Sequence, residues 1–182
     1  HRYGHQILVG NKELIGDGAI PLEIERLTRS HSVRRGGGFV GLAGQSIGVV
    51  GVGALGSRIV ELLGASGATN LTLIDPDALA ADNIFRHALP ARYLSSNKAE
   101  SMRDFLHARY PDMNVTALPE KIVAPTQLAD LGLDVLIIAI GDPTLERAIA
   151  AKHPVPIGVT TWLDAMGLGG HAILDDESVG CL

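Results

Sequence analysis

"GVVGVGALGSRIVELL", residues 48–63, holds four glycines, and three of them lie where an apolar run changes into a helical pattern. These three are Gly51, Gly53 and Gly56, and they permit a tight turn with close approach of the backbone. A helix that starts at such a turn presents free N–H groups and its positive dipole end, which together can bind a phosphate. A glycine turn used only for packing is the alternative, but the order strand, turn, helix favours a nucleotide site.

The rest of the chain continues this alternation of strand and helix. Short apolar or β-branched runs, typical of strands buried on both faces of a sheet, occupy residues 46–51, 70–75, 114–118, 134–142 and 155–161. Helical patterns lie between them, at residues 55–65, 98–109, 126–131 and 144–152. This order predicts an α/β fold, namely a Rossmann-like, doubly wound and mostly parallel sheet with helices on both faces. Functional groups in such a sheet lie just beyond the carboxyl ends of the strands.

Composition limits the classes of partner. The 182 residues include 15 basic and 20 acidic side chains, a net charge of -5, with no long run of either sign. This charge balance does not favour binding to nucleic acid or to an anionic membrane, so any phosphate binding must come from a few residues at one site. No apolar run approaches the roughly 20 residues that cross a bilayer. A single cysteine fits a reducing compartment, and we expect a cytoplasmic protein.

Two regions are expected along the chain. Residues 1–40 form a mixed N-terminal segment that ends in a glycine-rich linker, and residues 41–182 form the regular domain. The sequence starts at His1 rather than at a methionine and stops one residue after Cys181. We therefore expect a fragment that is truncated at the C-terminus.

A carboxylate follows the second predicted strand. Asp75 lies nineteen positions after Gly56 (75 − 56), at the end of that strand, where it can accept hydrogen bonds from both ribose hydroxyls of a nucleotide. That contact serves NAD as well as ATP, so Asp75 alone does not identify the nucleotide.

The residues after Asp75 distinguish the two chemistries. A hydride-transfer enzyme has no use for Asn83, Arg86 and Lys98 near the phosphates, whereas an adenylating enzyme does. When a carboxylate attacks the α-phosphate of ATP, negative charge grows on the phosphate oxygens, and fixed cations lower that barrier. Arg86 offers a planar fork and Lys98 a point charge, while Asn83 can orient a phosphate oxygen.

Asp142 ends the run "IIAIGD" at the same expected edge of the sheet, where its carboxylate is a candidate ligand for Mg²⁺. Each of these residues also has a simple alternative explanation. Asp142 can cap the following helix, Arg86 can form a surface ion pair, and Lys98 can be a solvated helix residue. The alternatives explain single residues but not the combined set.

Four stretches resemble the ThiF/MoeB/HesA family, the bacterial relatives of ubiquitin-activating enzymes. They are "GVGALGS" (51–57), "LIDPDALAADNIFRH" (73–87), "NKAESMRDFLHARYPDMNV" (97–115) and "IAIGD" (138–142). The resemblance extends from about residue 42 to the C-terminus, and the series of aspartate, asparagine, arginine and lysine is its most specific part.

The resemblance implies a reaction and a set of roles. Such proteins use ATP and Mg²⁺ to adenylate the C-terminal carboxylate of a ubiquitin-like or sulfur-carrier protein, commonly as homodimers. By this resemblance Asp75 holds the ribose, Gly53 and Gly56 lie along the nucleotide, and Asp77 lies near the same site. The remaining implied roles are phosphate binding by Asn83, Arg86 and Lys98, and metal binding by Asp142.

Two further features refine or weaken the match. "NIFRH" (83–87) and "TWLDAMGLGGHAIL" (161–174) are similar to ThiF-like domains of CBASS-type antiphage operons, in which a target protein is conjugated.

Family members often carry "RYxRQ" near the N-terminus, and the second arginine of this motif reaches the phosphates bound by the partner subunit. The corresponding stretch here is "RYGHQ" (2–6), which has His5 in place of that arginine. Arg34 or Arg35 is therefore the better candidate for an arginine that acts on the partner's site. An NAD(P)-binding oxidoreductase and a non-catalytic scaffold remain the alternative functions.

Three residues near these motifs have open roles. Trp162 and His171 flank a glycine-rich run and either line a channel for the target's C-terminal tail or serve as an aromatic anchor and a hydrogen-bonded histidine. His87 follows Arg86 directly and is expected to brace the loop, because a carboxylate nucleophile needs no base at neutral pH.

Overall fold

The structure is a computed structural model that describes residues 33, 36–37, 40–152 and 154–176. The predicted N-terminal segment, with His5, Arg34 and Arg35, lies almost entirely outside the described residues, as does Cys181. The predicted boundary between residues 40 and 41 therefore stays a prediction.

A six-stranded sheet forms the centre of the structure, in the order β3-β2-β1-β4-β5-β6. Its strands are β1 (Ser46–Val50), β2 (Asn70–Ile74), β3 (Asn114–Leu118), β4 (Val135–Ile138), β5 (Ile157–Leu163) and β6 (Gly170–Asp176). All neighbouring strands are parallel except β5 and β6, which are antiparallel. The predicted mostly parallel, doubly wound sheet is confirmed.

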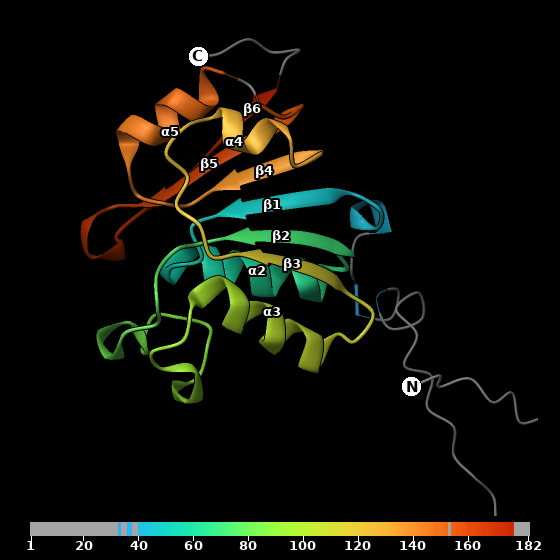
Figure 1. Cartoon of the computed structure of the whole chain (residues 1–182), viewed down its shortest axis with the longest axis vertical. Coiled ribbons are helices and arrows are strands. Elements are labelled where there is room, and N and C mark those ends of the chain that lie inside the picture. Colours follow the sequence, from blue (N-terminus) through green and yellow to red (C-terminus); the bar gives the residue numbers. More distant parts are fainter. Residues whose placement is uncertain (1–32, 34–35, 38–39, 153, 177–182) are drawn as a thin grey trace, which may run out of the picture.

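The helices cover both faces of this sheet. They are α2 (Ala54–Ser66), α3 (Lys98–Arg109), α4 (Thr126–Ala129) and α5 (Pro143–Ala150), with short 3-10 turns at Val40–Leu42, Ala81–Asn83, Ala91–Tyr93 and Ala165–Gly167. Figure 1 shows α2 and α3 on one face and α4 and α5 on the other. Helix α3 begins where the sequence predicts because the Asn97 side chain accepts a hydrogen bond from the Glu100 N–H as its N-cap.

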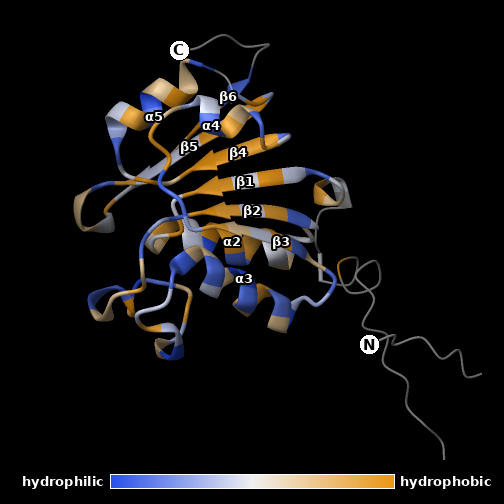
Figure 2. Cartoon of the chain, in the orientation of Figure 1, coloured by the Kyte–Doolittle hydropathy of each residue, from blue (hydrophilic) through white to orange (hydrophobic). Residues whose placement is uncertain are grey.

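Two apolar cores hold the helices to the sheet. Along β1, Val49 faces the core shared with α2 and α3, whereas Val50 faces the core shared with α4 and α5. Both valines are at most 2% exposed. Burial on both faces explains why the central strands read as continuous apolar runs in the sequence, and these strands are the most hydrophobic part of Figure 2.

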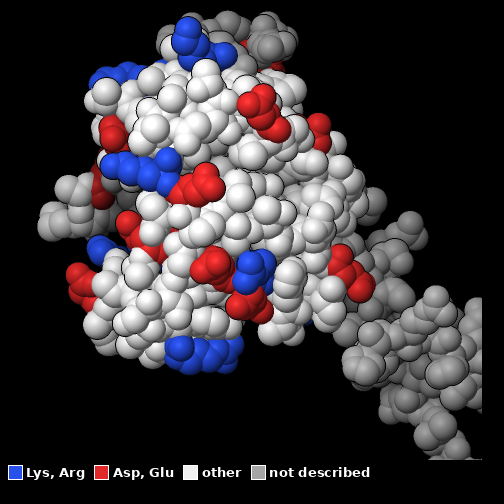
Figure 3. Space-filling view, viewed as in Figure 1, with Lys and Arg blue, Asp and Glu red and all other residues white. Residues whose placement is uncertain are grey.

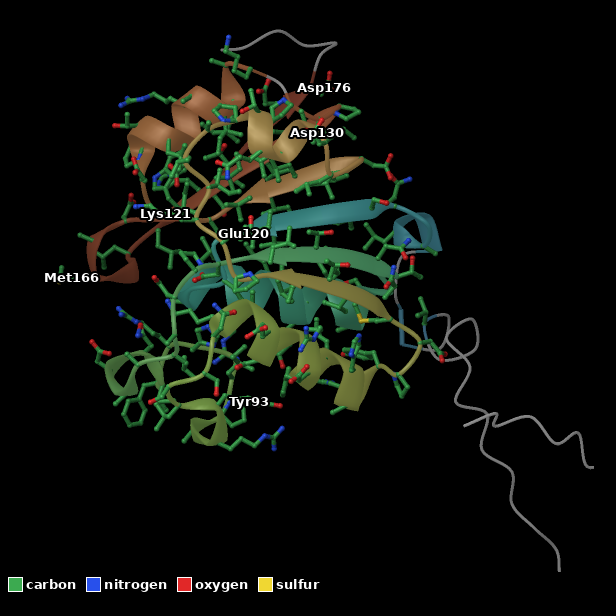
Figure 4. The ribbon with its side chains drawn as sticks, in the orientation of Figure 1. Tyr93, Glu120, Lys121, Asp130, Met166 and Asp176 are labelled. Atoms are coloured by element: carbon green, nitrogen blue, oxygen red, sulfur yellow. The ribbon has the colours of Figure 1, made fainter. Side chains whose placement is uncertain are left out.

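Strand β6 was not predicted from the sequence. Its residues are mostly exposed, so it lacks the buried apolar run that marks the other strands. The hairpin that joins it to β5 turns through Met166, which has a φ of 60° and is 90% exposed. Figure 4 shows Met166 at the far end of this hairpin, pointing away from the rest of the molecule.

The outer surface mixes charges of both signs. Figure 3 shows acidic and basic side chains interspersed over one face, without a large patch of either. Within the described part of the chain, every helix is too short or too polar to cross a membrane.

The register of the sheet gathers the candidate residues at one edge. Val50 at the end of β1 pairs with Ile74 at the end of β2 and with Ile138 at the end of β4. The residues that follow these three strands therefore leave the sheet side by side. Figure 1 shows the segment between β2 and α3 and the β5–β6 hairpin projecting on this same side.

Candidate functional site

The glycine loop between β1 and α2 depends on two of its three glycines for its shape. Gly51 has a φ of +87°, and a Cβ there would lie 2.5 Å from the carbonyl oxygen of Ala139. A Cβ on Gly56 would collide with the carbonyl oxygen of Gly51. Gly53 differs because the space around its missing Cβ is open. Gly51 and Gly56 thus pack the loop against the sheet and the helix, while Gly53 faces the space that a ligand could enter.

Helix α2 starts at this loop without a side-chain cap. Gly53 is its N-cap residue, and its first turn holds no acidic side chain. The first N–H groups of a helix have no acceptor within the helix, and the dipole places positive charge at that end. Since α2 runs for 13 residues, its N-terminus offers an uncompensated binding position for an anion.

Asp75 ties the glycine loop to the end of β2. Its Oδ2 accepts a hydrogen bond from the Val52 N–H at 2.6 Å, and its Oδ1 accepts one from the Asp77 N–H at 2.9 Å. The residue is 5% exposed. Each carboxylate oxygen can accept a second hydrogen bond, so the fixed carboxylate retains acceptor capacity for the hydroxyls of a ribose.

Asp77 and Lys98 form an ion pair across the base of the long segment between β2 and α3. Lys98 Nζ lies 2.9 Å from Asp77 Oδ2, and the Lys98 N–H donates to the Asp77 carbonyl. The lysine side chain is 9% exposed and that of the aspartate 66% exposed. Asp77, whose role the sequence leaves undefined, is thus the counter-charge of a nearly buried ammonium.

Asn83 and Arg86 form the second polar pair. Arg86 Nη2 donates to Asn83 Oδ1 at 2.9 Å, and the Arg86 N–H donates to the Asn83 carbonyl. Both side chains are accessible, and the neighbouring Phe85 is 98% exposed. The structure therefore joins Asn83 to Arg86 and Asp77 to Lys98, and among the described residues no hydrogen bond links one pair to the other.

His87 connects this segment to the glycine loop. Its Nδ1 accepts a hydrogen bond from the Leu89 N–H at 3.1 Å, so the proton lies on Nε2, which donates to the Val52 carbonyl at 2.7 Å. The residue is 3% exposed. Burial lowers the pKa of His87 from its ordinary value of 6.5, and this effect outweighs the hydrogen bond to Val52, which raises the pKa. The neutral imidazole is a structural brace, as the sequence predicts.

Two residues of α2 strengthen the brace. Ser57 Oγ accepts a hydrogen bond from the Ala88 N–H at 3.1 Å, and Arg58 Nη2 donates to the His87 carbonyl at 3.1 Å. The backbone that follows Arg86 is therefore held by the helix that begins at the glycine loop. These contacts fix the position of the arginine segment relative to the free N-terminus of α2.

Asp142 is the N-cap of α5, which is the alternative role considered for it. Its Oδ1 accepts hydrogen bonds from the N–H groups of Thr144 and Leu145, at 3.0 and 3.1 Å. The capping interactions leave Oδ2 able to bind a cation, and the side chain is exposed. The described residues contain no cluster of three or more metal-binding side chains. A single carboxylate fits Mg²⁺ that is held mainly by nucleotide phosphates and water.

Several contacts at this edge have no clear signal in the sequence. Ser57, Arg58 and Asn97 look like ordinary helix-surface and capping residues, yet each binds a part of the site. Glu146 is 7% exposed, and its Oε1 accepts a hydrogen bond from the Gly141 N–H at 2.9 Å. A glutamate four residues after Asp142 reads as a solvated helix charge, so its burial could not be predicted.

Trp162 and His171 stabilise the β5–β6 hairpin. They are direct cross-strand partners, and their rings stack with centroids 4.9 Å apart. His171 Nε2 also lies 2.9 Å from Asp164 Oδ2. These contacts match the anchor and hydrogen-bonded histidine considered above, while a channel for a peptide tail stays a prediction.

Comparisons with known proteins agree with this geometry. The profile of the ThiF family matches residues 33–151. The chain is 33% identical to the ATP-dependent ubiquitin transferase-like protein Cap2 of Pseudomonas aeruginosa, over 94% of this chain and 34% of that protein. It is 32% identical to Cap2 of Enterobacter hormaechei, over 57% of this chain and 18% of that protein. The chain thus spans about a third or less of these relatives.

Solved structures show the same fold. The E. coli tRNA N6-threonylcarbamoyladenosine dehydratase TcdA, in complex with ATP, superposes with a TM-score of 0.59 and 30% identity, covering 64% of this chain and 50% of TcdA. E. coli MccB, with AMPCPP and MccA, gives a TM-score of 0.60 at 18% identity, covering 66% of this chain and 37% of MccB, and supports the fold alone. Because the family profile covers more than half of the chain, this protein belongs to the ThiF family.

Proposed function

We propose that this chain binds ATP and adenylates the C-terminal carboxylate of a protein substrate, releasing pyrophosphate. The observation that carries the proposal is the convergence at one sheet edge of an uncapped helix N-terminus, the fixed Asp75 and the cations Arg86 and Lys98. An NAD-dependent enzyme has a use for Asp75 and the glycine loop but not for the two cations.

Each residue of the site has a separate proposed role in this reaction. Asp75 accepts hydrogen bonds from the ribose hydroxyls, and the open face of Gly53 lets the phosphates approach the N-terminus of α2. The substrate carboxylate then forms a bond to the α-phosphorus while the bond to pyrophosphate breaks. Arg86 and Lys98 stabilise the negative charge that grows on the α-phosphate oxygens. Asn83 positions the Arg86 guanidinium through its side-chain oxygen.

Asp142 is the proposed Mg²⁺ ligand. The ion would partly neutralise the charge of the triphosphate when bound. Asp142 is exposed, and its Oδ1 fixes the carboxylate to the start of α5, so Oδ2 is held in a defined place.

The finer identity of the substrate is part of the proposal. A ubiquitin-like, sulfur-carrier or conjugation-target protein would present its C-terminal tail to this edge, and a homodimer would bring an arginine from the partner. The likeness to Cap2 supports a ubiquitin transferase-like reaction, and the resemblance to CBASS-type proteins suggests a role in antiviral defence in the cytoplasm.

Pyrophosphate exchange into ATP tests the reaction. We expect exchange that requires both Mg²⁺ and an acceptor protein, assayed with candidate acceptors encoded beside the gene for this chain. Arg86→Ala is expected to abolish it. Arg92→Ala is the matched control, because Arg92 lies in the same segment but stacks on Tyr93. Exchange that survives Arg86→Ala would refute the proposed chemistry.

A further inference from the structure

Glu146 is a buried carboxylate that the proposed reaction does not use directly. It lies in the first part of α5 and is 7% exposed. Within the described part of the chain it has no ion-pair partner, and its Oε1 accepts a hydrogen bond from the Gly141 N–H at 2.9 Å. Burying a carboxylate costs free energy unless hydrogen bonds or ion pairs replace its contacts with water. We therefore expect the hydrogen bond between Glu146 and Gly141 to have a structural or functional role.

The contact holds the turn that carries Asp142. Gly141 connects β4 to α5 with a φ of +70°, a backbone conformation that residues other than glycine rarely adopt. On its other side, Asp142 is fixed by the N–H groups of Thr144 and Leu145. The Glu146 N–H also donates to the Asp142 carbonyl at 2.9 Å. The bond to Asp142 is an ordinary helical bond, so the contact specific to the glutamate side chain is the one to Gly141, directly before Asp142.

We propose that Glu146 is a positioning residue that sets the direction of the Asp142 carboxylate, and thereby the affinity for the divalent cation that accompanies ATP. This inference rests on the proposed function, since it requires Asp142 to bind that cation. On this proposal Glu146 acts through the hydrogen bond that its Oε1 accepts from the Gly141 N–H, and not through its charge.

The hydrogen bond and the charge can be separated by substitution. Glu146→Gln keeps an oxygen acceptor of the same reach but removes the charge, whereas Glu146→Ala removes both. Asp142→Asn keeps the helix cap but removes the charge that binds a cation. Together these variants show whether Glu146 acts through Asp142.

The experiment is isothermal titration of a non-hydrolysable ATP analogue, first in EDTA and then across a range of Mg²⁺ concentrations. We expect Glu146→Ala to raise the Mg²⁺ concentration for half-maximal enhancement about tenfold, as is typical when a residue that orients a metal ligand is lost. Affinity in EDTA should stay within about twofold of wild type, and Glu146→Gln should resemble wild type throughout. The double variant Asp142→Asn/Glu146→Ala should be no weaker than Asp142→Asn alone, because the two residues act on one cation.

The outcomes separate the inference from the proposed function. Wild-type protein that shows no Mg²⁺-dependent binding of the analogue would refute the proposed function, and the inference with it. Wild-type dependence that is unchanged in Glu146→Ala would overturn the inference alone. A loss in Glu146→Gln equal to that in Glu146→Ala would also overturn it, since the charge would then be responsible. If the alanine variant does not fold, Glu146→Asp replaces it and should show the same loss, because its shorter side chain cannot reach the Gly141 N–H.

Discussion

Removal of the His87 side chain tests whether this residue holds the glycine loop and the segment after Arg86 together. His87→Ala leaves the Val52 carbonyl and the Leu89 N–H without their partners, in a position where the native side chain is 3% exposed. Each buried group that loses its hydrogen bond costs about 1–3 kcal/mol. Two such groups give an expected loss on the order of 2–6 kcal/mol in the free energy of unfolding.

Urea denaturation followed by circular dichroism measures this loss. His107→Ala is the matched control, because His107 is an exposed histidine on α3 and its substitution should change the free energy of unfolding by less than about 0.5 kcal/mol. His87→Gln should be intermediate, since its amide supplies both a donor and an acceptor. A loss below about 0.5 kcal/mol for His87→Ala would refute the brace.

The same residue predicts a pH dependence. In the unfolded chain His87 takes up a proton near pH 6.5, whereas burial lowers its pKa in the folded state, where Lys98 and Arg58 act in the same direction and Asp75 opposes them. As pH falls below 6.5 the unfolded state binds the extra proton, so the free energy of unfolding falls, with a slope of at most about 1.4 kcal/mol per pH unit from this one group. Wild-type and His87→Gln proteins should differ in this slope between pH 5 and 7 and agree above it, and equal slopes would contradict the assignment.

Three further substitutions test other parts of the site. Gly56→Ala should lower the melting temperature, since its Cβ collides with a backbone oxygen and overpacking costs about 1–3 kcal/mol; a melting temperature equal to wild type would exclude the tight turn. Asp142→Ala should cost about 1 kcal/mol in urea denaturation through the lost cap, and Asp142→Asn much less; equal losses would show that capping is not the structural role. Asp77→Asn should destabilise the ligand-free protein, because Lys98 loses its counter-charge. For the same reason the variant should bind ATP more tightly in calorimetry. Weaker ATP binding would indicate that Asp77 contacts the nucleotide.

The sequence predicts the parts of this fold that depend on periodicity and on local chemistry. The central strands are apolar on both faces, and α3 covers the residues 98–109 that its helical pattern predicts. The convergence of Asp75 with the glycine loop follows from the rule that parallel strands end at one edge. Strand β6 could not be predicted because its exposed residues carry no pattern of burial.

Contacts between segments that are distant in the sequence cannot be predicted from periodicity or local chemistry. The sequence identifies Asp77 and Lys98 as members of one site, but their pairing depends on how the chain between them returns to the end of β2. Glu146 is buried beside the turn at Gly141, where its side chain accepts the Gly141 N–H, and its spacing in the sequence does not indicate this contact. These residues have ordinary spacings, so only the three-dimensional structure assigns their partners.

Calorimetric binding of ATP and NADH to wild type, Arg86→Ala and Arg92→Ala shows directly whether this edge of the sheet binds a triphosphate. We predict that the wild type binds ATP more tightly than NADH. Arg86→Ala should weaken ATP about tenfold or more through the lost charge-assisted hydrogen bonds and change adenosine by less than about twofold, while Arg92→Ala should match the wild type. Tighter binding of NADH than of ATP, or equal ATP affinities for the two arginine variants, would show that this edge is not a triphosphate site built around Arg86.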